Sequence, residues 1–507
     1  MTEHAVLIVI PVADRPRQLA ECLASLARLR AHHPYGGRVE LLIADDSLEP
    51  AAAAEHRAVA AAQCAPGMTV HHLDRGAQHA LHAALPPALR ERLAGVIGVD
   101  ADGRQGASVL RNLALLWIAR HYSASERLLI WFVDSDERFQ LEAGTDEVQP
   151  DYLGAFDRLF ADSAVQVATG KVVGDPPVAP AVMAGTLLED LTAALERLTP
   201  LAPDQPCPFH DPPAPAVAEA AYHDMLDLFG YRPPVAAQAW SCPLCGPHAA
   251  LAGLAALVEA LPRFFDGVHP TRAIAPAATA AGVQPARTVY TGNYVLRGPR
   301  PAWFIPFAAL GLRMAGPALG RLLRTVLGPR FISVPLPLQH GRALAALGRS
   351  ECRPGVERLG EVVELAAEFE RQYWGDVLLF TVEALTAQGY PEAHVPAAAL
   401  RHTLEAVEAR LYARYAAQQQ VVGARLAALR GWLADPPAAW RGAQPLVALD
   451  LFARQLAHNF GPTGSGWRRV HAPEARATWR ARLAAALADY PGQRRAWAEA
   501  LACLGAA

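Results

Sequence analysis

The sequence predicts an α/β protein whose core is a mostly parallel, doubly wound sheet. Two observations lead to this fold class. Short runs of apolar, β-branched residues recur along about the first 175 residues, without the polar alternation of half-exposed strands. Alanine- and leucine-rich stretches with helical spacing separate these runs. Strands that alternate with helices in this rhythm form parallel sheets joined by crossover helices.

The first elements are expected in a regular order. A helix is predicted after Asp14, which stands where an N-cap belongs, and apolar residues recur at helical spacing as far as Leu29. An alanine-rich helix follows residue 47, and a further helix is predicted over residues 106–120. The strands that these helices connect are predicted over residues 5–11, 39–44, 69–73, 127–133 and 164–173.

Residues 176–285 interrupt this rhythm, because they are rich in proline and carry only short helical patterns. We interpret them as an irregular insertion in a sheet domain that spans residues 1–345. Two late strands are predicted over residues 288–296 and 331–338, with a helical stretch over residues 304–326 between them.

The pattern changes after residue 345. Amphipathic helices are predicted over residues 355–388, 396–433, 445–459 and 473–504. The sequence therefore predicts a second, all-helical domain over residues 346–507. An oligomer that forms through this domain is one expectation.

Composition excludes several classes of protein. With 507 residues, 52% hydrophobic and 19% charged, the chain has the apolar content that disordered proteins lack. Its net charge of −3 argues against a dedicated nucleic-acid binder, which carries a strong basic excess. Lys171 is the only lysine among 46 Lys and Arg residues, and asparagine is found only at Asn112, Asn293 and Asn459. These survivors in a depleted chain are candidates for function.

The chain carries no recognisable signal for export or for a membrane span. Its start lacks a basic region followed by a cleavage site, and no stretch approaches about 18 uninterrupted apolar residues. Seven cysteines do not suit a disulfide framework. A cytoplasmic protein is the expectation. The apolar residues 303–307 are interpreted as part of a buried helix, with peripheral membrane contact as the alternative.

Acidic side chains follow three of the predicted strands. Asp14 comes after the first strand, Asp45 and Asp46 end the second, and Asp134 and Asp136 follow residues 127–133. Ligands of open parallel sheets bind outside the carboxyl ends of the strands, so these groups should meet at one rim. An Asp-x-Asp pair there can hold Mg²⁺ or Mn²⁺ together with diphosphate oxygens. The alternative is that the pair caps a helix.

Four segments together resemble glycosyltransferases of the GT-A fold, family 2-like. The resemblance is good over about the first 175 residues and extends less closely to His340. The segments that carry it are Pro11-x-x-Asp14-Arg15, Ala44-Asp45-Asp46-Ser47, Gly106-x-Ser108-x-x-Arg111-Asn112 and Asp134-x-Asp136.

The resemblance implies roles for several of these residues. Asp45 or Asp46 would accept a hydrogen bond from the nucleobase imide, with Pro11 packed nearby. Asp134 and Asp136 would hold the metal and the diphosphate of a UDP- or GDP-sugar, and Arg111 would face that donor. In many such enzymes a late histidine is a further metal ligand. His340 stands where that residue would, although a surface histidine past a strand end explains it as well.

Transfer of the sugar requires that the charge of the leaving diphosphate be neutralised. A metal and nearby cations do this, and Lys171 and Arg111 are the candidates. Asn112 and Asn293 are candidates for contacts with the nucleotide-sugar, the alternative for Asn293 being turn chemistry beside Gly292. The acceptor stays unidentified.

The catalytic base is left open among four residues. Inverting enzymes use an acidic residue to deprotonate the acceptor. The pair Glu189-Asp190 occurs within a predicted helix, where a solvated helix face explains it equally well, and the Gln-x-x-Arg-Trp segment of processive members is absent. The candidates are Asp190, Asp175, Asp266 and His269.

Two further pairs have the spacing of a structural zinc site. Cys207-x-x-His210 and Cys242-x-x-Cys245 lie in the proline-rich insertion. Each pair could equally be a turn with buried thiols.

Two other functions remain as alternatives to glycosyl transfer. A nucleotidyltransferase would need a glycine-rich loop after the first strand, which is missing here, and a non-catalytic nucleotide-sugar-binding or scaffold protein would not need the intact acidic pair.

Overall fold

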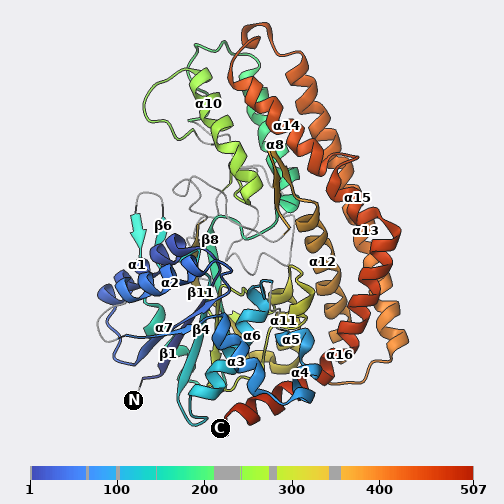
Figure 1. The fold of residues 1–507 in the computed structure, drawn as a ribbon. Helices are drawn as coiled ribbons and strands as arrows, with labels where there is room; N and C mark the ends of the chain where they lie inside the picture. The colour runs from blue at the N-terminus through green and yellow to red at the C-terminus, as the bar shows by residue number, and fades with distance from the viewer. Residues whose placement is uncertain are drawn as a thin grey trace.

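A central mixed sheet organises the protein (Figure 1). The computed structural model describes residues 3–63, 68–98, 103–143, 146–210, 240, 242–272, 282–341 and 355–505. Across the sheet the strands follow the order β3 (Thr69–Leu73), β2 (Val39–Asp45), β1 (Ala5–Val12), β4 (Leu128–Val133), β10 (Asn293–Arg297), β8 (Val167–Gly174), β11 (Phe331–His340) and β5 (Glu137–Arg138). The short strand β9 (Gln284–Pro285) pairs with β11 outside this path.

The predicted α/β sheet with mostly parallel strands is confirmed. Strands β3, β2, β1 and β4 are parallel neighbours, and so are β8 and β11. The exceptions are β10, which lies antiparallel between β4 and β8, and the two-residue strands β5 and β9, which pair antiparallel with β11. The order of the strands reverses at β1: β2 and β3 lie on one side of it, and β4 lies on the other side.

Both faces of the sheet are covered, which explains the continuous apolar runs. Alternate residues of β1, β2 and β4 belong to two separate buried clusters. One cluster includes side chains of α1 (Pro16–His32), α2 (Pro50–Gln63) and α7 (Tyr152–Phe160). The other includes side chains of α3 (Arg75–Ala84), α4 (Pro87–Arg92), α5 (Ala94–Ile97) and α6 (Ala107–His121). Figure 1 shows the two groups of helices on opposite sides of the sheet.

The second cluster continues from the sheet into the C-terminal helices. These are α12 (Ala366–Thr386), α13 (Ala397–Ala434), α14 (Pro445–Phe460), α15 (Ser465–His471) and α16 (Pro473–Gly505). Helix α12 packs on α11 (Ala315–Leu327), and α16 packs on α6. One apolar core therefore joins the sheet to the helices. The predicted boundary at residue 345 lies outside the described residues.

The predicted insertion supplies α8 (Pro180–Leu198), α10 (Ala250–Ala260) and the 3₁₀ helix η2 (Leu261–Asp266). These helices lie with α14 at the end of the molecule opposite to the two termini (Figure 1). The helix α8 packs against α13 and contacts α12 and α14. The insertion is thus built onto the helical region.

Three predicted elements differ from the structure. Residues 357–364 form a hairpin of β12 (Glu357–Leu359) and β13 (Val362–Glu364), and positive φ at Gly355 and Gly360 keeps the helix from starting before Ala366. Only the later part of residues 304–326 is helical beyond the short turn η3 (Ala308–Leu310), because Met314 has a positive φ. The strand predicted from residue 288 begins at Asn293.

Asp14 is not an N-cap. Its φ is +50°, a left-handed conformation, and α1 begins two residues later with Arg15 at the N-cap and no capping side-chain bond. Positive φ is uncommon for residues other than glycine, and aspartate is among those that tolerate it best. The turn leaves the Asp14 carboxylate beyond the end of β1.

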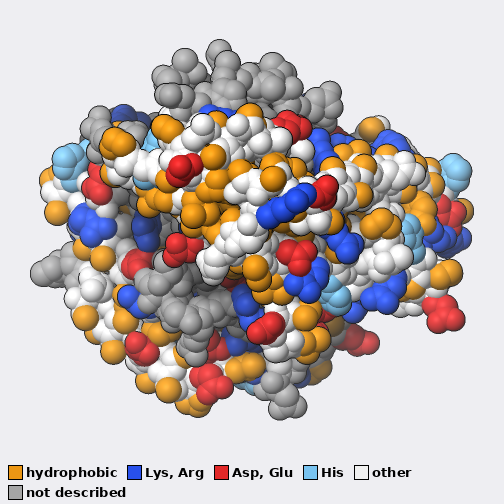
Figure 2. Space-filling model, turned by 90° about the horizontal axis from the view of Figure 1, so that it is seen from above, with side chains coloured by type: hydrophobic (Ala, Val, Ile, Leu, Met, Phe, Trp, Pro, Cys, Tyr) orange, Lys and Arg blue, Asp and Glu red, His pale blue; other side chains and the backbone are white. Residues whose placement is uncertain are grey.

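The segment 303–307 is buried but is not a helix. Phe304, Ile305 and Phe307 are each less than 5% exposed, and the rings of Phe304 and Phe307 pack on Tyr490 of α16. Among the described residues, no helix has the length and apolar character of a membrane span. On the face seen in Figure 2, acidic and basic side chains are interspersed.

The Asn293 side chain connects three strands in the middle of the sheet by hydrogen bonds. Its amide nitrogen donates to the carbonyl oxygens of Lys171 in β8 and Leu336 in β11, at 2.9 Å each. Its amide oxygen accepts from the indole of Trp131 in β4 at 3.1 Å. The pairing of β11 with β8 shifts register between Ser333 and Pro337, so the Asn293 amide satisfies a carbonyl that this irregularity leaves out of the ladder.

We predict that Asn293→Ala destabilises the fold by about 3 kcal/mol or more, because it leaves two carbonyl oxygens and an indole N–H without a hydrogen-bond partner. Urea unfolding measures the change. The control is Thr478→Ala, which removes an exposed hydroxyl from α16 and should change stability by less than about 0.5 kcal/mol. Equal midpoints for Asn293→Ala and the wild type would refute this role.

Candidate functional site

The candidate site lies where the order of the strands reverses. Strands β1 and β4 are parallel neighbours, and ligands of open α/β sheets usually bind beyond the carboxyl ends of the strands at such a point. Asp14 follows β1 and Asp134 follows β4. Asp45 ends β2, the other neighbour of β1. The predicted meeting of three acidic strand ends at one rim therefore matches the topology.

Four residues form what we call the acidic cluster: Asp134, Asp136, Glu137 and His340. One carboxylate oxygen from each of the three acids lies within 4.8 Å of the others. The antiparallel pairing of β5 with β11 places Glu137 opposite His340. The Nε2 atom of His340 is 3.6 Å from Oδ2 of Asp136. Three acids from the end of β4 and a histidine from the end of β11 thus meet.

His340 has the orientation of a ligand. Its Nδ1 atom lies 2.5 Å from the carbonyl oxygen of Asp175, to which it donates its proton. In the neutral ring the Nε2 atom carries the lone pair, and this atom faces Asp136. A hydrogen bond from the other ring nitrogen to a carbonyl is what fixes the tautomer of metal-binding histidines. The ring is 4% exposed, so the interpretation of His340 as a surface histidine does not hold.

Glu137 is the member that the sequence interpretation missed. Its Oε1 atom accepts from the Tyr290 hydroxyl at 2.6 Å, whereas its buried Oε2 atom has no hydrogen-bond partner. Burial, together with the charge of Asp136, raises the pKa of Glu137 to about 8. A buried carboxylate that has an unpartnered oxygen and lies close to two further carboxylates is an environment that a cation would stabilise.

Arg111 balances part of this charge. It reaches from α6 and forms an ion pair with Oδ1 of Asp134, and it also donates to the carbonyl of Ala107. Removal from water raises the pKa of Asp134, and Arg111 opposes that rise. The Arg111 side chain is 4% exposed, and its Nε atom has no hydrogen-bond partner. Arg111 thus lies beside the acidic cluster, as the resemblance implied.

The donor set fits a hard divalent cation. Three carboxylates and one imidazole are ligands that Mn²⁺ and Mg²⁺ accept, and the carboxylates favour these ions over Zn²⁺, which prefers thiolates and imidazoles. The unpartnered Oε2 atom of Glu137 is the observation that supports the fit.

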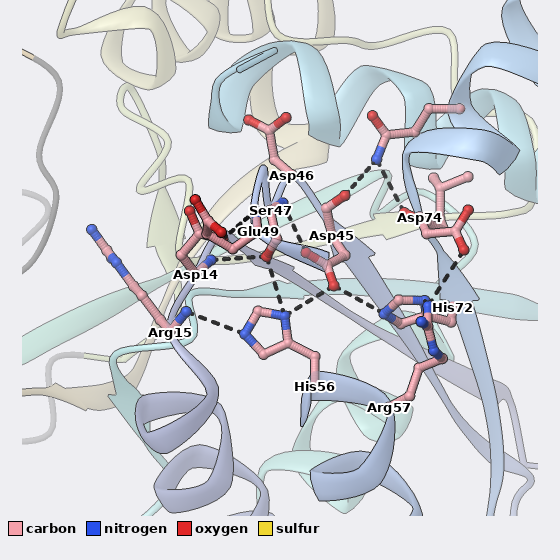
Figure 3. A network of polar contacts seen from close by, with 12 residues as sticks. Asp14, Arg15, Asp45, Asp46, Ser47, Glu49, His56, Arg57, His72 and Asp74 are labelled. Carbon is pink, nitrogen blue, oxygen red and sulfur yellow. Dashed lines mark hydrogen bonds and ion pairs between the residues drawn. The ribbon is translucent and has the colours of Figure 1, made fainter. Parts of the chain in front are cut away.

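A second polar network surrounds Asp45 (Figure 3). One carboxylate oxygen, Oδ2, lies 2.9 Å from Nδ1 of His56 and 3.1 Å from Nε2 of His72. The other oxygen accepts from the backbone of Ser47 at 2.9 Å. Although burial acts in the opposite direction, these hydrogen bonds hold the pKa of Asp45 well below its usual range. The protein itself already occupies both oxygens of Asp45.

Asp46 and Asp14 lie on the side of this network that faces α6. The Asp46 carboxylate points away from the two histidines (Figure 3) and accepts from the backbone N–H groups of Gln105 and Gly106. The Asp14 carboxylate pairs with Arg104. Gly106 has a φ of +80°, which presents its N–H toward Asp46 just before α6 begins. Asp46 therefore joins the end of β2 to the start of α6.

The two asparagines proposed as donor contacts have structural roles instead. Asn112 is fully buried and bonds the backbone of Val96 and both backbone groups of Ile305. Asn293 makes the three bonds described above. Both amide groups are therefore already hydrogen-bonded within the protein, which argues against a contact with a sugar. Lys171 is half-buried in β8, and Pro11 lies in β1 opposite Ala44.

Two of the four base candidates, Asp190 and His269, lie close together and share Thr271 as a partner. Asp190 of α8 forms a bidentate pair with Arg272 and accepts from Thr271, while His269 is buried beside Thr186 and Thr271. Burial lowers the pKa of His269 to about 3, which keeps it neutral. Asp266 pairs with Arg358 of β12.

Only one base candidate stands at the sheet. Asp175 directly follows β8, and both its backbone N–H and its carbonyl bond to His340. It therefore lies next to the acidic cluster, whereas the other three lie with α8, η2 and β12.

The predicted zinc pairs lie away from this rim, beside α10. Cys207, His210 and Cys242 come together there, but the fourth member of the group is His248 and not Cys245. Cys245 is exposed.

A cavity of about 450 Å³ lies elsewhere again, between α8, α12 and α13. Glu189, Asp376 and Arg425 are among its lining residues, and no member of the acidic cluster is. Here the chemistry of the strand ends, rather than the size of a cavity, locates the candidate site.

Glu137, His56, His72 and Arg104 were not foreseen. A weak signal existed for Glu137, because it extends Asp134-x-Asp136 by one acid. The histidines of α2 and β3 could not be assigned to Asp45, since their contacts arise only when three separate segments pack together.

Comparisons with known proteins find matches among solved structures only. No protein-family model and no curated protein matches the chain. The mannosyltransferase PcManGT from Pyrobaculum calidifontis, in complex with GDP-Man and Mn²⁺, matches over 96% of this chain and 86% of that chain, with 13% identity and a TM-score of 0.33.

Two shorter matches are of the same kind. Mouse xyloside xylosyltransferase 1 matches over 33% of this chain and 52% of that chain, with 12% identity and a TM-score of 0.22. Core-mannan synthase A from Aspergillus fumigatus, in its Mn/GDP form, matches over 39% and 49%, with 13% identity and a TM-score of 0.19. Matches of this size assign neither a family nor an activity to this chain.

We predict that Glu137 makes the protein less stable as pH rises when Mg²⁺ and Mn²⁺ are absent. The folded state keeps the Glu137 proton up to a pKa of about 8, whereas the unfolded state releases it near pH 4.5, so the folded state binds more protons between these values. This one group lowers the free energy of unfolding by up to about 1.4 kcal/mol per pH unit in that window.

Thermal midpoints of the wild type and Glu137→Gln, measured between about pH 5 and pH 8, test this. The wild-type midpoint should fall relative to that of the variant as pH rises, and addition of Mn²⁺ should reduce the difference. Parallel curves without a divalent cation would refute the raised pKa.

Proposed function

We propose that this protein transfers a sugar from a nucleoside-diphosphate sugar to an acceptor hydroxyl and requires Mn²⁺ or Mg²⁺ to do so. The observation that carries the proposal is the acidic cluster at the reversal of strand order, with a buried carboxylate oxygen that has no partner. Diphosphate oxygens complete the coordination of such cations in nucleotide sites.

In this proposal Asp134, Asp136 and His340 would hold the cation. The carboxylate of Glu137 would add negative charge that favours its binding. When bound, the cation stabilises the negative charge that develops on the leaving diphosphate. Arg111 beside Asp134 contributes to the same field. Lys171 is proposed as a second cation toward the donor.

The nucleoside would lie over the ends of β1 and β2. Pro11 lines the end of β1, and Asp14, Asp46 and Arg104 form the polar side chains at this edge. We propose Asp46 as the acceptor for the nucleobase imide, with Asp45 as the residue that positions it. Each oxygen of Asp46 accepts one backbone N–H and its carboxylate points away from the histidines, whereas His56 and His72 already share Oδ2 of Asp45.

The reaction also needs a group that takes the acceptor proton if the attack is direct. The bond from the anomeric carbon to the diphosphate oxygen breaks, a bond to the acceptor oxygen forms, and the acceptor proton passes to the base. Among the four candidates we propose Asp175, since its backbone N–H and carbonyl both bond to His340 and so place it next to the acidic cluster.

Calorimetric titration of UDP and GDP, each with and without Mn²⁺, tests donor binding. We expect one of the two to bind only when Mn²⁺ is present. Asp136→Asn should weaken this binding by at least about tenfold, because it removes a charge-assisted ligand. The control is Asp435→Asn, which removes an exposed carboxylate from a surface ion pair and should change nothing.

Two results would contradict this binding mode. One is that neither nucleotide binds at any Mn²⁺ concentration. The other is equal binding with and without the cation, which would leave the acidic cluster without a ligand role.

A panel of UDP- and GDP-sugars incubated with cell extract, followed by mass spectrometry, tests turnover. We expect release of a nucleoside diphosphate together with a product heavier by one sugar. Asp175→Asn should lower the rate by about 100-fold or more while donor binding persists. Formation of a nucleoside triphosphate and a sugar 1-phosphate when pyrophosphate is added to the donor would instead identify a nucleotidyltransferase, and binding without any turnover would identify a non-catalytic protein.

A further inference from the structure

A second group of potential metal ligands lies in the insertion, far in sequence from the acidic cluster. Its members are Cys207, His210, Cys242 and His248, and one ligand atom from each lies within 4.8 Å of the others. The residues come from two segments. The first follows α8, and the second immediately precedes α10.

The distances within this group suit a tetrahedral ion. The Nε2 atoms of His210 and His248 are 3.3 Å apart, and Sγ of Cys242 is 3.2 Å from Nε2 of His248. Two nitrogens bound to tetrahedral zinc at about 2.0–2.1 Å are separated by about 3.3 Å, and a sulfur and a nitrogen by about 3.6 Å. The two measured separations are close to these values, and all four ligand atoms lie within 4.8 Å of one another.

The tautomer of His248 is also fixed for ligation. Its Nδ1 atom lies 2.9 Å from the carbonyl oxygen of Gly246, to which it donates. The lone pair of Nε2 therefore faces His210 and Cys242. A carbonyl behind a ligand histidine orients the ring and raises its basicity.

The backbone holds the two segments in register. The N–H of Cys207 donates to the carbonyl of His248 at 2.9 Å, and the N–H of Cys242 donates to the carbonyl of Phe209 at 3.2 Å. Phe209 is buried against Trp240, with ring centroids 5.0 Å apart. The ligands are thus carried by a paired structure with its own apolar support.

We propose that Cys207, His210, Cys242 and His248 bind one structural Zn²⁺. Two thiolates and two imidazoles form a closed ligand set with no open position, which is typical of structural zinc. The same soft donors disfavour Mg²⁺ and Mn²⁺, so the site is distinct in chemistry from the acidic cluster. The ion would tie the end of α8 to the start of α10. This proposal does not depend on glycosyl transfer.

The ligand set differs from the one that the spacing suggested. Cys242-x-x-Cys245 has the familiar knuckle spacing, yet Cys245 is exposed and His248 takes the fourth position. Cys245 and His248 therefore form a matched pair for a test, because only one of them should matter.

Elemental analysis of the purified, reduced full-length protein is the direct measurement. We expect about one zinc per chain in the wild type and in Cys245→Ser, and less than about a tenth of that in Cys242→Ser and His248→Ala. Zinc retained in His248→Ala but lost in Cys245→Ser would overturn this ligand set. Absence of zinc from the wild type, even after it is supplied during reconstitution, would overturn the site itself.

A second measurement covers variants that fail to fold. In the folded wild type, two thiols should resist modification by a thiol reagent and become reactive when a strong chelator is added. After reconstitution with Co²⁺, the absorption bands of tetrahedral cobalt with thiolate ligands should appear and should persist in Cys245→Ser. Thiols that react at the same rate with and without the chelator, or a disulfide between Cys207 and Cys242, would contradict the proposal.

Discussion

The concentration of negative charge at the end of β4 is the constraint on which the site depends. Asp134, Asp136 and Glu137 bring three carboxylates within 4.8 Å of one another at the edge of a buried strand. Like charges so close and so poorly hydrated cannot all ionise without compensation. Arg111 supplies part of it, and the Glu137 proton or a bound cation must supply the rest.

Pairing within the sheet holds Glu137 and His340 close to each other. The two-residue strand β5 pairs with the end of β11, which sets Glu137 against His340. Asn293 secures the irregular stretch of β11 just before that point, through bonds to β8, β11 and β4. The buried asparagine is therefore structural, and its contribution to the site is to hold the strand that carries His340.

The strands could be predicted from the sequence because both faces of the sheet are buried, which leaves uninterrupted apolar runs such as residues 5–11. The position of Asp134 and Asp136 followed from the same pattern. Glu137 and the histidines around Asp45 could not be predicted, since a two-residue strand and contacts between distant segments leave no periodicity. The scarcity of asparagine in the sequence did not distinguish ligand-binding residues from structural ones. Asn112 and Asn293 satisfy buried backbone groups, and such an amide is as hard to replace as a ligand.

The central claim is that the acidic cluster is a cation site with His340 as a ligand. Crystals grown with Mn²⁺ and a nucleoside diphosphate, measured at a wavelength where manganese scatters anomalously, test it most directly. The account predicts one anomalous peak in contact with Asp136 and with Nε2 of His340, and its loss in crystals of Asp136→Asn. A peak absent from this position, or Glu137 and His340 unmoved around an ordered water in a crystal saturated with Mn²⁺, would contradict it.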